Sequence, residues 1–336
     1  MKLAIIGRTQ MLYHTVQLLH QRGHQIAVVI TDKAAPEYTR TEEDFRLLAE
    51  SIRAPFVLTN TLNDSQVQDL CRGLDVGITL NWRTMIQENY IKLFRLGILN
   101  AHIGDLPEYR GNACPNWAII NGADKITTSI HFIEDGKLDC GRVIGQTHFD
   151  LGENGTLTDV YRWSESAIPE LFIEVLNQLQ TDEDYTLKYA DPDSAESFRC
   201  YPRLPEDGFI DWNITVQEVH NLIRAVCPPL AGAYTYHDYK GELKKLIILK
   251  SRIVQHELKD LAISGHILKN DKQSGESWVK CSDGIIAITQ CRYENEIESF
   301  SPGQRWKSIR MRLGIRVEDW IYRMMNEQKT NPINLS

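Results

Sequence analysis

Short apolar runs alternate with amphipathic stretches through the first third of the chain. Five apolar runs predict buried strands, at residues 3–7, 25–31, 56–59, 76–80 and 97–101. Three amphipathic stretches predict the helices between them, at residues 10–21, 41–53 and 64–72. Continuous apolar strands alternating with helices are typical of a mostly parallel sheet covered on both faces. The pattern therefore predicts a doubly wound, Rossmann-like α/β fold.

The rest of the chain completes this first part and then changes to a pattern of short strands. Two strands, a helix from Thr156 to about Leu179 and a polar stretch at 181–196 that is typical of a linker complete the first part. Beyond it, a helix precedes short strand-like runs at hairpin spacing, at residues 234–239, 245–254, 265–268 and 283–288. We expect a first domain at 1–198, a smaller β-rich, OB-like barrel at 199–312 and a helical tail at 313–336.

Composition and charge exclude several classes of protein. The 336 residues carry 37 Lys and Arg against 45 Asp and Glu, a net charge of −8, which argues against a dedicated nucleic-acid binder. No apolar run reaches the length of a membrane span, and the N-terminus predicts a strand rather than a signal peptide. The seven scattered cysteines form no CxxC pair, which disfavours a disulfide framework or a zinc site. We therefore expect a cytoplasmic protein without a metal.

Common nucleotide and hydrolase motifs are missing. The first strand-to-helix turn, Gly7-Arg8-Thr9-Gln10-Met11, lacks the G-x-G-x-x-G spacing with which a backbone approaches a pyrophosphate. The chain also contains neither G-x-x-x-x-G-K-[ST] nor G-x-S-x-G. The motifs thus lend no support to NAD, FAD, ATP hydrolysis or a serine hydrolase.

Three polar residues are candidates for chemistry. Asn100 and His102 end the fifth predicted strand, where ligands of open α/β sheets bind, and their spacing of two turns both side chains to one side. An amide can donate to an oxyanion, and an imidazole can act as a general base. An aspartate of the glycine-containing loop at 135–141 could fix the imidazole tautomer and raise its pKa. From spacing alone, a solvated histidine and a turn-forming aspartate remain open as the alternative.

The surrounding residues carry a specific resemblance. The string N-A-H-I-G-D-L-P-E-Y-R-G at 100–111, followed by L-D-C-G at 138–141, resembles the formyltransferase family that uses N10-formyltetrahydrofolate. The resemblance implies a catalytic role for Asn100, His102 and Asp139. It also implies that main-chain groups of two segments hold the pterin of this cofactor, the formyl donor. The residues expected there are Trp82, Arg83, Met85, Ile86, Asp135, Gly136 and Lys137.

The resemblance continues into the second half and covers roughly residues 1 to 290. Blocks at 115–122, 201–208, 210–212, 222–225 and 229–234 follow in the family's order. One departure is Gly104-Asp105, where the family has Ser-Leu; the Asp105 carboxylate could meet a substrate amine or cap the loop. The residues expected to contact the acceptor substrate are Asp105, Tyr109, Arg110, Asn112, Trp117, Tyr201, Arg203 and Trp212. Among them, Arg203 lies close in the sequence to aromatic residues and is expected to bind a diphosphate of the acceptor.

Within the family, the blocks look closest to sugar N-formyltransferases that act on nucleotide-linked amino sugars. The string G-D-L-P…G-N-A-C-P-N-W is similar to enzymes of pseudaminic-type acid pathways, which implies a UDP- or dTDP-linked 4-amino-4,6-dideoxy sugar for a surface glycan. The alternatives are a methionyl-tRNA formyltransferase, which would favour basic stripes, a formyltetrahydrofolate hydrolase and a non-catalytic binding module. No nucleic acid or membrane partner is expected. The basic residues Arg305, Lys307, Arg310, Arg312 and Arg316 suggest a solvated face, a homodimer contact or an anion site.

Overall fold

The structure is a computed structural model that describes residues 1–330 apart from 37, 195, 240 and 256–260. The chain forms two compact units. The first comprises Met1–Ala118, Asp124–Gly152 and Asp159–Pro202. The second comprises Ile119–Ala123, Glu153–Thr158 and the chain from Arg203 onward. The expected boundary at 198/199 lies just before this division, and nothing in the sequence pattern indicates that two short segments of the first half join the second unit.

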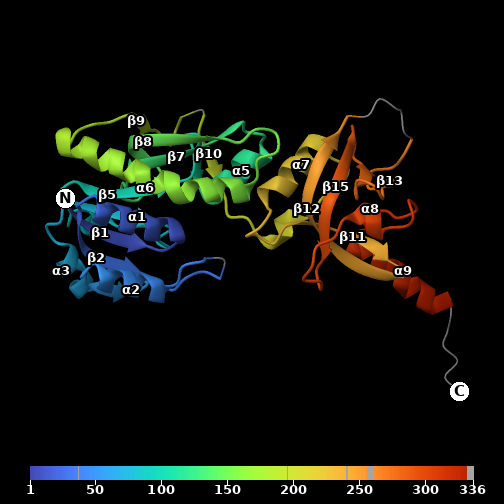
Figure 1. Cartoon of the computed structure of the whole chain (residues 1–336), viewed down its shortest axis with the longest axis horizontal. Helices are drawn as coiled ribbons and strands as arrows, with labels where there is room; N and C mark the ends of the chain where they lie inside the picture. The colour runs from blue at the N-terminus through green and yellow to red at the C-terminus, as the bar shows by residue number, and fades with distance from the viewer. Residues whose placement is uncertain (37, 195, 240, 256–260, 331–336) are drawn as a thin grey trace, which may run out of the picture. The chain divides into compact units, whose positions relative to one another are not determined.

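The first unit is built on an eight-stranded sheet in the order β3-β2-β1-β4-β5-β7-β8-β9 (Figure 1). Its strands are β1 (Lys2–Gly7), β2 (Gln25–Thr31), β3 (Phe56–Leu58), β4 (Val76–Leu80), β5 (Gly97–His102), β7 (Lys125–Phe132), β8 (Gly141–Asp150) and β9 (Lys188–Ala190). The first five pair in parallel, whereas β7, β8 and β9 join antiparallel. The doubly wound prediction is confirmed, with an antiparallel extension at one edge.

Helices cover both faces of this sheet. They are α1 (Gln10–Gln21), α2 (Glu42–Ser51), α3 (Ser65–Cys71), α4 (Glu88–Ile91) and α6 (Leu157–Thr181), whereas α5 (Cys114–Ile120) contributes to neither core cluster of the sheet. Along β1, Leu3 and Ile5 lie in a buried cluster with side chains of α1, α2 and α6, while Ala4 and Ile6 lie in a second cluster with those of α3 and α4. Burial on both faces explains why the strands are continuous apolar runs.

The polar stretch 181–196 is not a simple linker, which corrects the sequence-based interpretation. It contains β9, which pairs with β8. A second short pairing joins β10 (Phe198–Cys200) in parallel to β6 (Tyr109–Gly111), directly after the loop that follows β5. Strands of three residues are too short for a two-residue alternation to stand out. These pairings attach the segment around residue 200 to the neighbourhood of Asn100 and His102.

The second unit contains a five-stranded antiparallel sheet in the order β11-β12-β15-β14-β13. Its elements are η1 (Pro205–Gly208), α7 (Val216–Ala225), β11 (Ala233–Tyr239), β12 (Glu242–Val254), β13 (Ile267–Asn270), β14 (Ser277–Lys280), β15 (Ile285–Tyr293), α8 (Pro302–Arg305) and α9 (Val317–Thr330). Leu313 bridges to His237 of β11, and the adjacent Arg312 bridges to His266, next to β13. This segment therefore connects the two edge strands and gives the sheet a barrel-like form.

Two expectations for the second unit need correction. Strand β14 was missed because its four residues alternate buried and half-buried positions over too short a run. The expected tail at 313–336 begins inside the segment that connects β11 and β13, so the barrel extends beyond residue 312. The helical part of the tail is α9, and residues 331–336 lie outside the described part of the chain.

His237 makes the stability of the second unit sensitive to acid. It is fully buried and stacked on Tyr293, with ring centroids 5.6 Å apart, and this burial lowers its pKa to about 4. An unfolded histidine titrates near 6.5, so below that pH the unfolded state binds more protons than the folded one. We expect the free energy of unfolding to fall by up to about 3 kcal/mol as the pH drops from 6.5 to 4.

Urea unfolding of His237→Phe and wild type at pH 7 and pH 4.5 tests this prediction. The phenylalanine variant should lose part of the acid-induced drop in the urea midpoint, whereas His20→Gln, at an exposed position of α1, should keep all of it. An identical drop in His237→Phe and wild type would show that other groups cause the acid sensitivity.

Candidate active site

The structure brings together the three residues proposed from the sequence. Asn100 and His102 lie at the end of β5, and Asp139 comes from the loop between β7 and β8. The Asp139 Oδ2 atom lies 3.6 Å from Nδ1 of His102, and both side chains are largely buried. Strand β7 runs antiparallel beside β5, so β7 ends next to the beginning of β5 and not next to His102. The glycine-containing loop from β7 to β8 brings Asp139 back to the imidazole.

A main-chain carbonyl fixes the tautomer of His102. The Nε2 atom lies 2.8 Å from the carbonyl oxygen of Tyr109, which can only accept a hydrogen bond, so Nε2 carries the proton. Nδ1 is then the nitrogen with a free lone pair, and it faces Asp139. The bond depends on Gly104, because a Cβ at that position would lie 2.4 Å from Nε2 and 2.5 Å from the Tyr109 oxygen. This contact gives a physical reason for glycine at the first departure from the family pattern.

Asp139 is held by the main chain rather than by the imidazole. Its Oδ2 atom accepts a hydrogen bond from the Gly111 N–H at 2.8 Å, whereas the distances to His102 and His131 are 3.6 Å and 3.7 Å. Those two distances are too long for hydrogen bonds. The hypothesis that Asp139 orients His102 is therefore replaced: Tyr109 orients the ring, and Asp139 offers a negative charge to an imidazolium formed beside it.

His131 is a site residue that the sequence analysis missed. It lies opposite Asn100 in the register of β5 and β7, and its Nε2 atom is 3.1 Å from the Asn100 amide nitrogen. Its Nδ1–H donates to the carbonyl of Phe132 at 3.0 Å, which leaves Nε2 as an acceptor. Burial lowers the pKa of His131, against the opposing effect of Asp139, so the ring stays neutral at pH 7. Neutral His131 thus fixes which way the Asn100 amide points.

We predict that His131→Leu lowers kcat about tenfold, because the buried Asn100 amide loses the acceptor that orients it. His131→Gln can restore an acceptor oxygen and should recover part of the rate. Steady-state kinetics of formyl transfer measure both, with the KM of each substrate as a control for binding. If the leucine variant keeps the wild-type kcat and loses only thermal stability, His131 is a packing residue.

The residues expected to hold the donor lie on two loops of the first unit. The first follows β4 and contains Trp82, Arg83, Met85 and Ile86; the second follows β7 and contains Asp135, Gly136 and Lys137. The loops are joined, because the Glu88 N–H donates to Asp135 Oδ1 at 3.1 Å. Met85 is half exposed, whereas Ile86 is a core residue. Arg83 pairs with Asp32 at 2.9 Å and Lys137 with Glu134 at 2.9 Å.

The main chain of both loops is available to a ligand. Among the described residues, no hydrogen bond uses the N–H or C=O groups of residues 83–86. In the second loop, the Asp135 and Gly136 main-chain groups are likewise unused by the described residues, and Gly136 has φ +68° with open space where a Cβ would project. Exposed main-chain donors and acceptors of this kind suit a flat heterocycle with a polar edge.

Asp105 has protein partners for its charge. Its carboxylate accepts hydrogen bonds from Lys188 at 3.2 Å, Gln146 at 3.1 Å and Thr127 at 3.2 Å. Burial alone would raise the pKa of Asp105, but these bonds and the Lys188 charge hold it below its usual range. Asp105 thus fastens its loop to side chains of β7, β8 and β9 rather than capping the loop main chain, and these partners favour a structural role over one in which it receives a substrate amine.

The other expected acceptor residues of the first unit differ in their surroundings. Tyr109 is buried against Phe198, and Arg110 bonds Ser197 Oγ at 2.6 Å, so both hold β6 to the segment before and within β10. The Trp117 indole N–H donates to the carbonyl of Tyr201 at 2.9 Å. Asn112 is exposed, and the Tyr201 side chain is 64 % exposed. Asn112 and Tyr201 are therefore the most accessible of this set.

The two expected residues of the second unit support its own fold. Trp212 is 2 % exposed, and its indole N–H donates to Thr235 at 3.0 Å, so it offers no surface to a ligand. Arg203 is half-buried and donates to the carbonyl of Asp207 at 2.7 Å, which closes the turn at η1. The exposed Arg199, not singled out from the sequence, lies instead on β10 with its guanidinium 5.6 Å from the Tyr201 ring centre.

Known structures share this fold at low sequence identity. WlaRD, a sugar 3N-formyl transferase solved in the presence of dTDP and 5-N-formyl-THF, is 19 % identical with a TM-score of 0.60 over 88 % of this chain and 99 % of its own. An N-formyltransferase from Helicobacter canadensis, solved with folinic acid and dTDP-3-aminofucose, is 17 % identical with a TM-score of 0.58 over 86 % and 98 %. HypX from Aquifex aeolicus is 16 % identical with a TM-score of 0.56 over 92 % of this chain, which spans only 49 % of HypX.

Family models match most of the chain. The formyl transferase model matches residues 1–176, and the model of the formyl transferase C-terminal domain matches residues 204–301. The two matches follow the two units described above and include Asn100, His102, His131 and Asp139 in the first. The chain therefore belongs to the formyl transferase family.

Proposed function

We propose that this enzyme transfers a formyl group from N10-formyltetrahydrofolate to the amino group of a nucleotide-linked amino sugar. The observation that carries the proposal is the arrangement of Asn100, His102 and Asp139, with a free Nδ1 lone pair 3.6 Å from a carboxylate. The shared fold with WlaRD and the Helicobacter canadensis enzyme, over nearly their full lengths, supports a sugar acceptor. Both of those proteins were solved with a formylated folate and a dTDP compound.

The residues present give each step of the transfer a partner. Nδ1 of His102 takes a proton from the amine as its nitrogen attacks the formyl carbon, and Asp139 stabilises the imidazolium. One N–H of the Asn100 amide is bonded to His131, and the other donates to the oxyanion. Such a donor stabilises the transition state by about 3–4 kcal/mol. The bond between the formyl carbon and N10 of the folate then breaks, and His102 returns the proton to that nitrogen. Nδ1 of His102 is unprotonated again at the end of the reaction.

The two loops after β4 and β7 fit the donor. The folate pterin has a polar edge that main-chain groups can recognise, and residues 83–86 and 135–136 present such groups without protein partners among the described residues. The side chains of Arg83 and Lys137 are already paired with Asp32 and Glu134. We therefore assign donor binding mainly to the main chain of these loops, with Met85 as an apolar contact.

The acceptor site centres on β10. This strand pairs with β6, which follows the catalytic loop and whose Gly111 binds Asp139, so the pairing joins β10 to the catalytic residues. Arg199 and Tyr201 are both exposed there. A guanidinium can bind a diphosphate through paired charge-assisted hydrogen bonds, and a phenol ring can pack on a base. Arg199 takes the diphosphate role that the sequence analysis assigned to Arg203.

We predict that Arg199→Ala raises the KM for the nucleotide sugar about 10- to 150-fold, the loss of one charge-assisted contact, with the folate KM little changed. Steady-state kinetics with each substrate varied in turn measure the effect. Arg72→Ala, which removes an exposed arginine beyond α3, serves as the matched control and should leave both constants unchanged. If Arg203→Ala raises the KM for the nucleotide sugar more than Arg199→Ala does, Arg203 is the residue that binds the diphosphate.

The identity of the sugar, the nucleotide and the pathway is proposed from the sequence. The resemblance of residues 104–117 supports a 4-amino-4,6-dideoxy sugar linked to UDP or dTDP and a role in surface-glycan synthesis of the pseudaminic type. All seven cysteines are free thiols, in keeping with a reducing cytoplasm. Within the described residues, no helix is long and apolar enough to cross a membrane. A homodimer remains part of this proposal.

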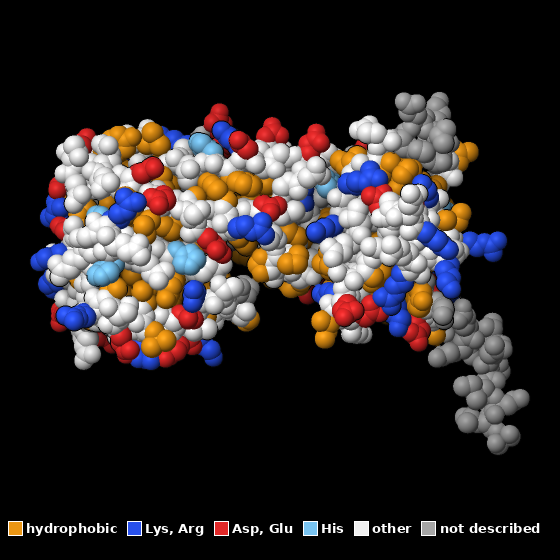
Figure 2. Space-filling view, in the orientation of Figure 1, with side chains coloured by type: hydrophobic (Ala, Val, Ile, Leu, Met, Phe, Trp, Pro, Cys, Tyr) orange, Lys and Arg blue, Asp and Glu red, His pale blue; other side chains and the backbone are white. Residues whose placement is uncertain are grey.

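The net charge of −8 disfavours a tRNA acceptor. On the face drawn in Figure 2, Asp and Glu side chains are interspersed with Lys and Arg over the first unit, which contains the catalytic residues. Binding an acceptor stem would need many phosphate contacts and would weaken steeply with salt. A nucleotide sugar needs a single diphosphate site, which Arg199 can supply.

A further inference from the structure

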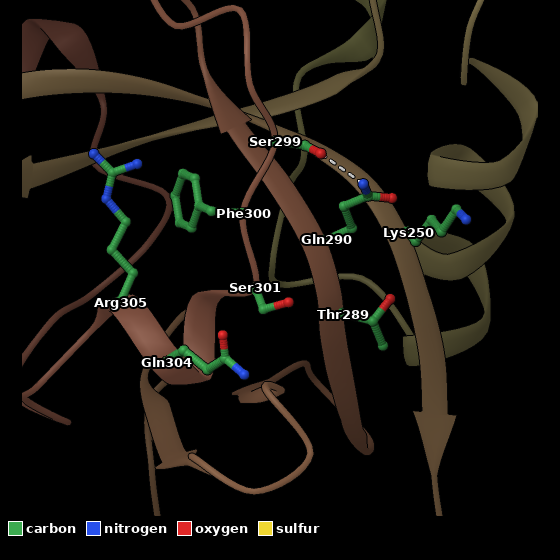
Figure 3. Close-up of a pocket in the computed structure, with 8 residues that line it drawn as sticks. All are labelled: Lys250, Thr289, Gln290, Ser299, Phe300, Ser301, Gln304 and Arg305. Carbon is green, nitrogen blue, oxygen red and sulfur yellow. Dashed lines mark hydrogen bonds between the residues drawn. The ribbon is translucent and has the colours of Figure 1, made fainter.

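The second unit carries a polar pocket that the proposed reaction does not use. It has a volume of about 580 Å³ and is formed by β12, β15, α8 and the segment that leads into α8 (Figure 3). Its lining residues are Lys250, Thr289, Gln290, Ser299, Phe300, Ser301, Gln304 and Arg305. The volume is in the range of small-molecule sites, about 300–1,000 Å³. None of these residues belongs to the donor, acceptor or catalytic sets described above.

The walls of the pocket are held in place by the sheet. Lys250 faces Gln290 at an irregularity of the β12–β15 ladder, where the register shifts on both sides of Lys250. Irregularities of this kind re-aim side chains and often accompany binding sites. The opposite wall is fixed because Phe300 and Cys291 exchange two main-chain hydrogen bonds of 2.8 and 3.0 Å. The Gln290 amide donates to Ser299 Oγ at 2.6 Å within the lining (Figure 3).

Most of the lining consists of neutral hydroxyls and amides. Thr289, Ser299 and Ser301 supply hydroxyls, and Gln290 and Gln304 supply amides, as Figure 3 shows for all five. Such groups donate and accept hydrogen bonds without a fixed charge, which matches the hydroxyls of a sugar ring. An apolar ligand would leave these groups without partners and would bind poorly.

Phe300 is the aromatic residue of the pocket, and Arg305 covers one face of its ring. The Arg305 guanidinium lies over the Phe300 ring, 4.2 Å from its centre, and also over Tyr293 at 5.0 Å. The same guanidinium is paired with both carboxylate oxygens of Glu296 at 2.6 Å. Arg305 is therefore held between a carboxylate and two rings. The pocket favours hydrogen bonding over the stacking that a nucleobase would require.

Lys250 supplies the charge of the pocket. Its ammonium makes no ion pair with any residue that the structure describes, whereas Arg305 is neutralised by Glu296. The lining therefore carries one uncompensated positive charge beside its hydroxyls and amides. A ligand that matches both features has several hydroxyls and one anionic group.

We propose that this pocket binds a sugar that carries a single phosphate, at a site separate from the acceptor site on β10. The sugar hydroxyls bond the Thr289, Ser301 and Gln304 side chains, and the phosphate binds Lys250. The proposal is independent of the identity of the formyl acceptor, because no residue is shared between the two sites. Among the lining basic residues, it assigns the anion to Lys250 rather than to Arg305.

Titration calorimetry of the full-length protein with glucose 1-phosphate tests the proposal, with glucose and inorganic phosphate as partial probes. We expect Lys250→Met to weaken glucose 1-phosphate binding at least about tenfold and to leave the weak binding of glucose unchanged. Thr289→Val should weaken both sugars. Lys280→Met, which removes a lysine of β14 outside the pocket, and Arg199→Ala should bind as wild type does.

Four results would overturn the proposal. Wild-type affinity in both Lys250→Met and Thr289→Val would place the ligand elsewhere, and loss of binding in Arg199→Ala would place it in the acceptor site. Inorganic phosphate that binds as tightly as glucose 1-phosphate would reduce the pocket to an anion site. No heat of binding with wild type at millimolar glucose 1-phosphate would show that the pocket does not take this class of ligand.

Discussion

Replacing His102 with alanine should lower kcat at least about 100-fold, the usual scale for loss of a general base. The imidazole is placed for this role because the Tyr109 carbonyl holds the proton on Nε2 and leaves Nδ1 to accept the amine proton beside Asp139. The neighbouring His131 cannot substitute, because its Nε2 atom already accepts from Asn100. Single-turnover formyl transfer at saturating substrates measures the chemical step directly.

Binding of the folate should survive the substitution, because the loops after β4 and β7, which we propose hold the donor, do not include His102. Calorimetry with 5-formyltetrahydrofolate is the control for this part of the prediction. Gly104→Ala is a second probe, since its Cβ would displace the ring from the Tyr109 carbonyl and slow the reaction while the base is still present. A His102→Ala enzyme that turns over at nearly the wild-type rate would remove His102 from the mechanism.

Asn100→Ala should lower kcat by about 100- to 1,000-fold, the range measured for single oxyanion donors. The amide is directed by neutral His131, which leaves its second hydrogen for the oxyanion of the proposed reaction. An interaction made mainly in the transition state affects kcat far more than KM. Steady-state kinetics with both substrates varied distinguish the two effects. An alanine variant with a raised KM and an unchanged kcat would make Asn100 a ground-state binding residue.

The parallel half of the fold could be predicted because its strands are buried on both faces. In β1, Leu3 to Ile6 are all fully buried, which produces the continuous apolar run seen in the sequence. The strands β6, β9, β10 and β14 have three or four residues each and carry no comparable signal. The segment that connects β11 and β13 was also missed, because it pairs through only a few residues around Leu313.

In the candidate site, too, some residues could be predicted from the sequence and others could not. Asn100 and His102 are neighbours along one strand, so spacing alone placed them together, and the resemblance added Asp139. His131 could not be found in this way, because its contact with Asn100 depends on the register of β5 and β7. The role of Tyr109 was hidden for another reason: its main-chain carbonyl binds His102, and every residue type offers the same group. Arg203 could not be told from Arg199 as an anion site, because its bond to Asp207 is visible only in the folded turn.

The most direct test of the account is mass spectrometry of nucleotide-linked amino sugars incubated with this protein and N10-formyltetrahydrofolate. A panel of UDP- and dTDP-linked amino sugars should contain at least one that gains a single formyl group, with release of one tetrahydrofolate per product and little sensitivity to salt. Efficient, strongly salt-sensitive formylation of charged initiator tRNA, with no nucleotide sugar modified, would contradict the account. Consumption of the folate to formate without any formylated product would contradict it equally, in favour of a hydrolase.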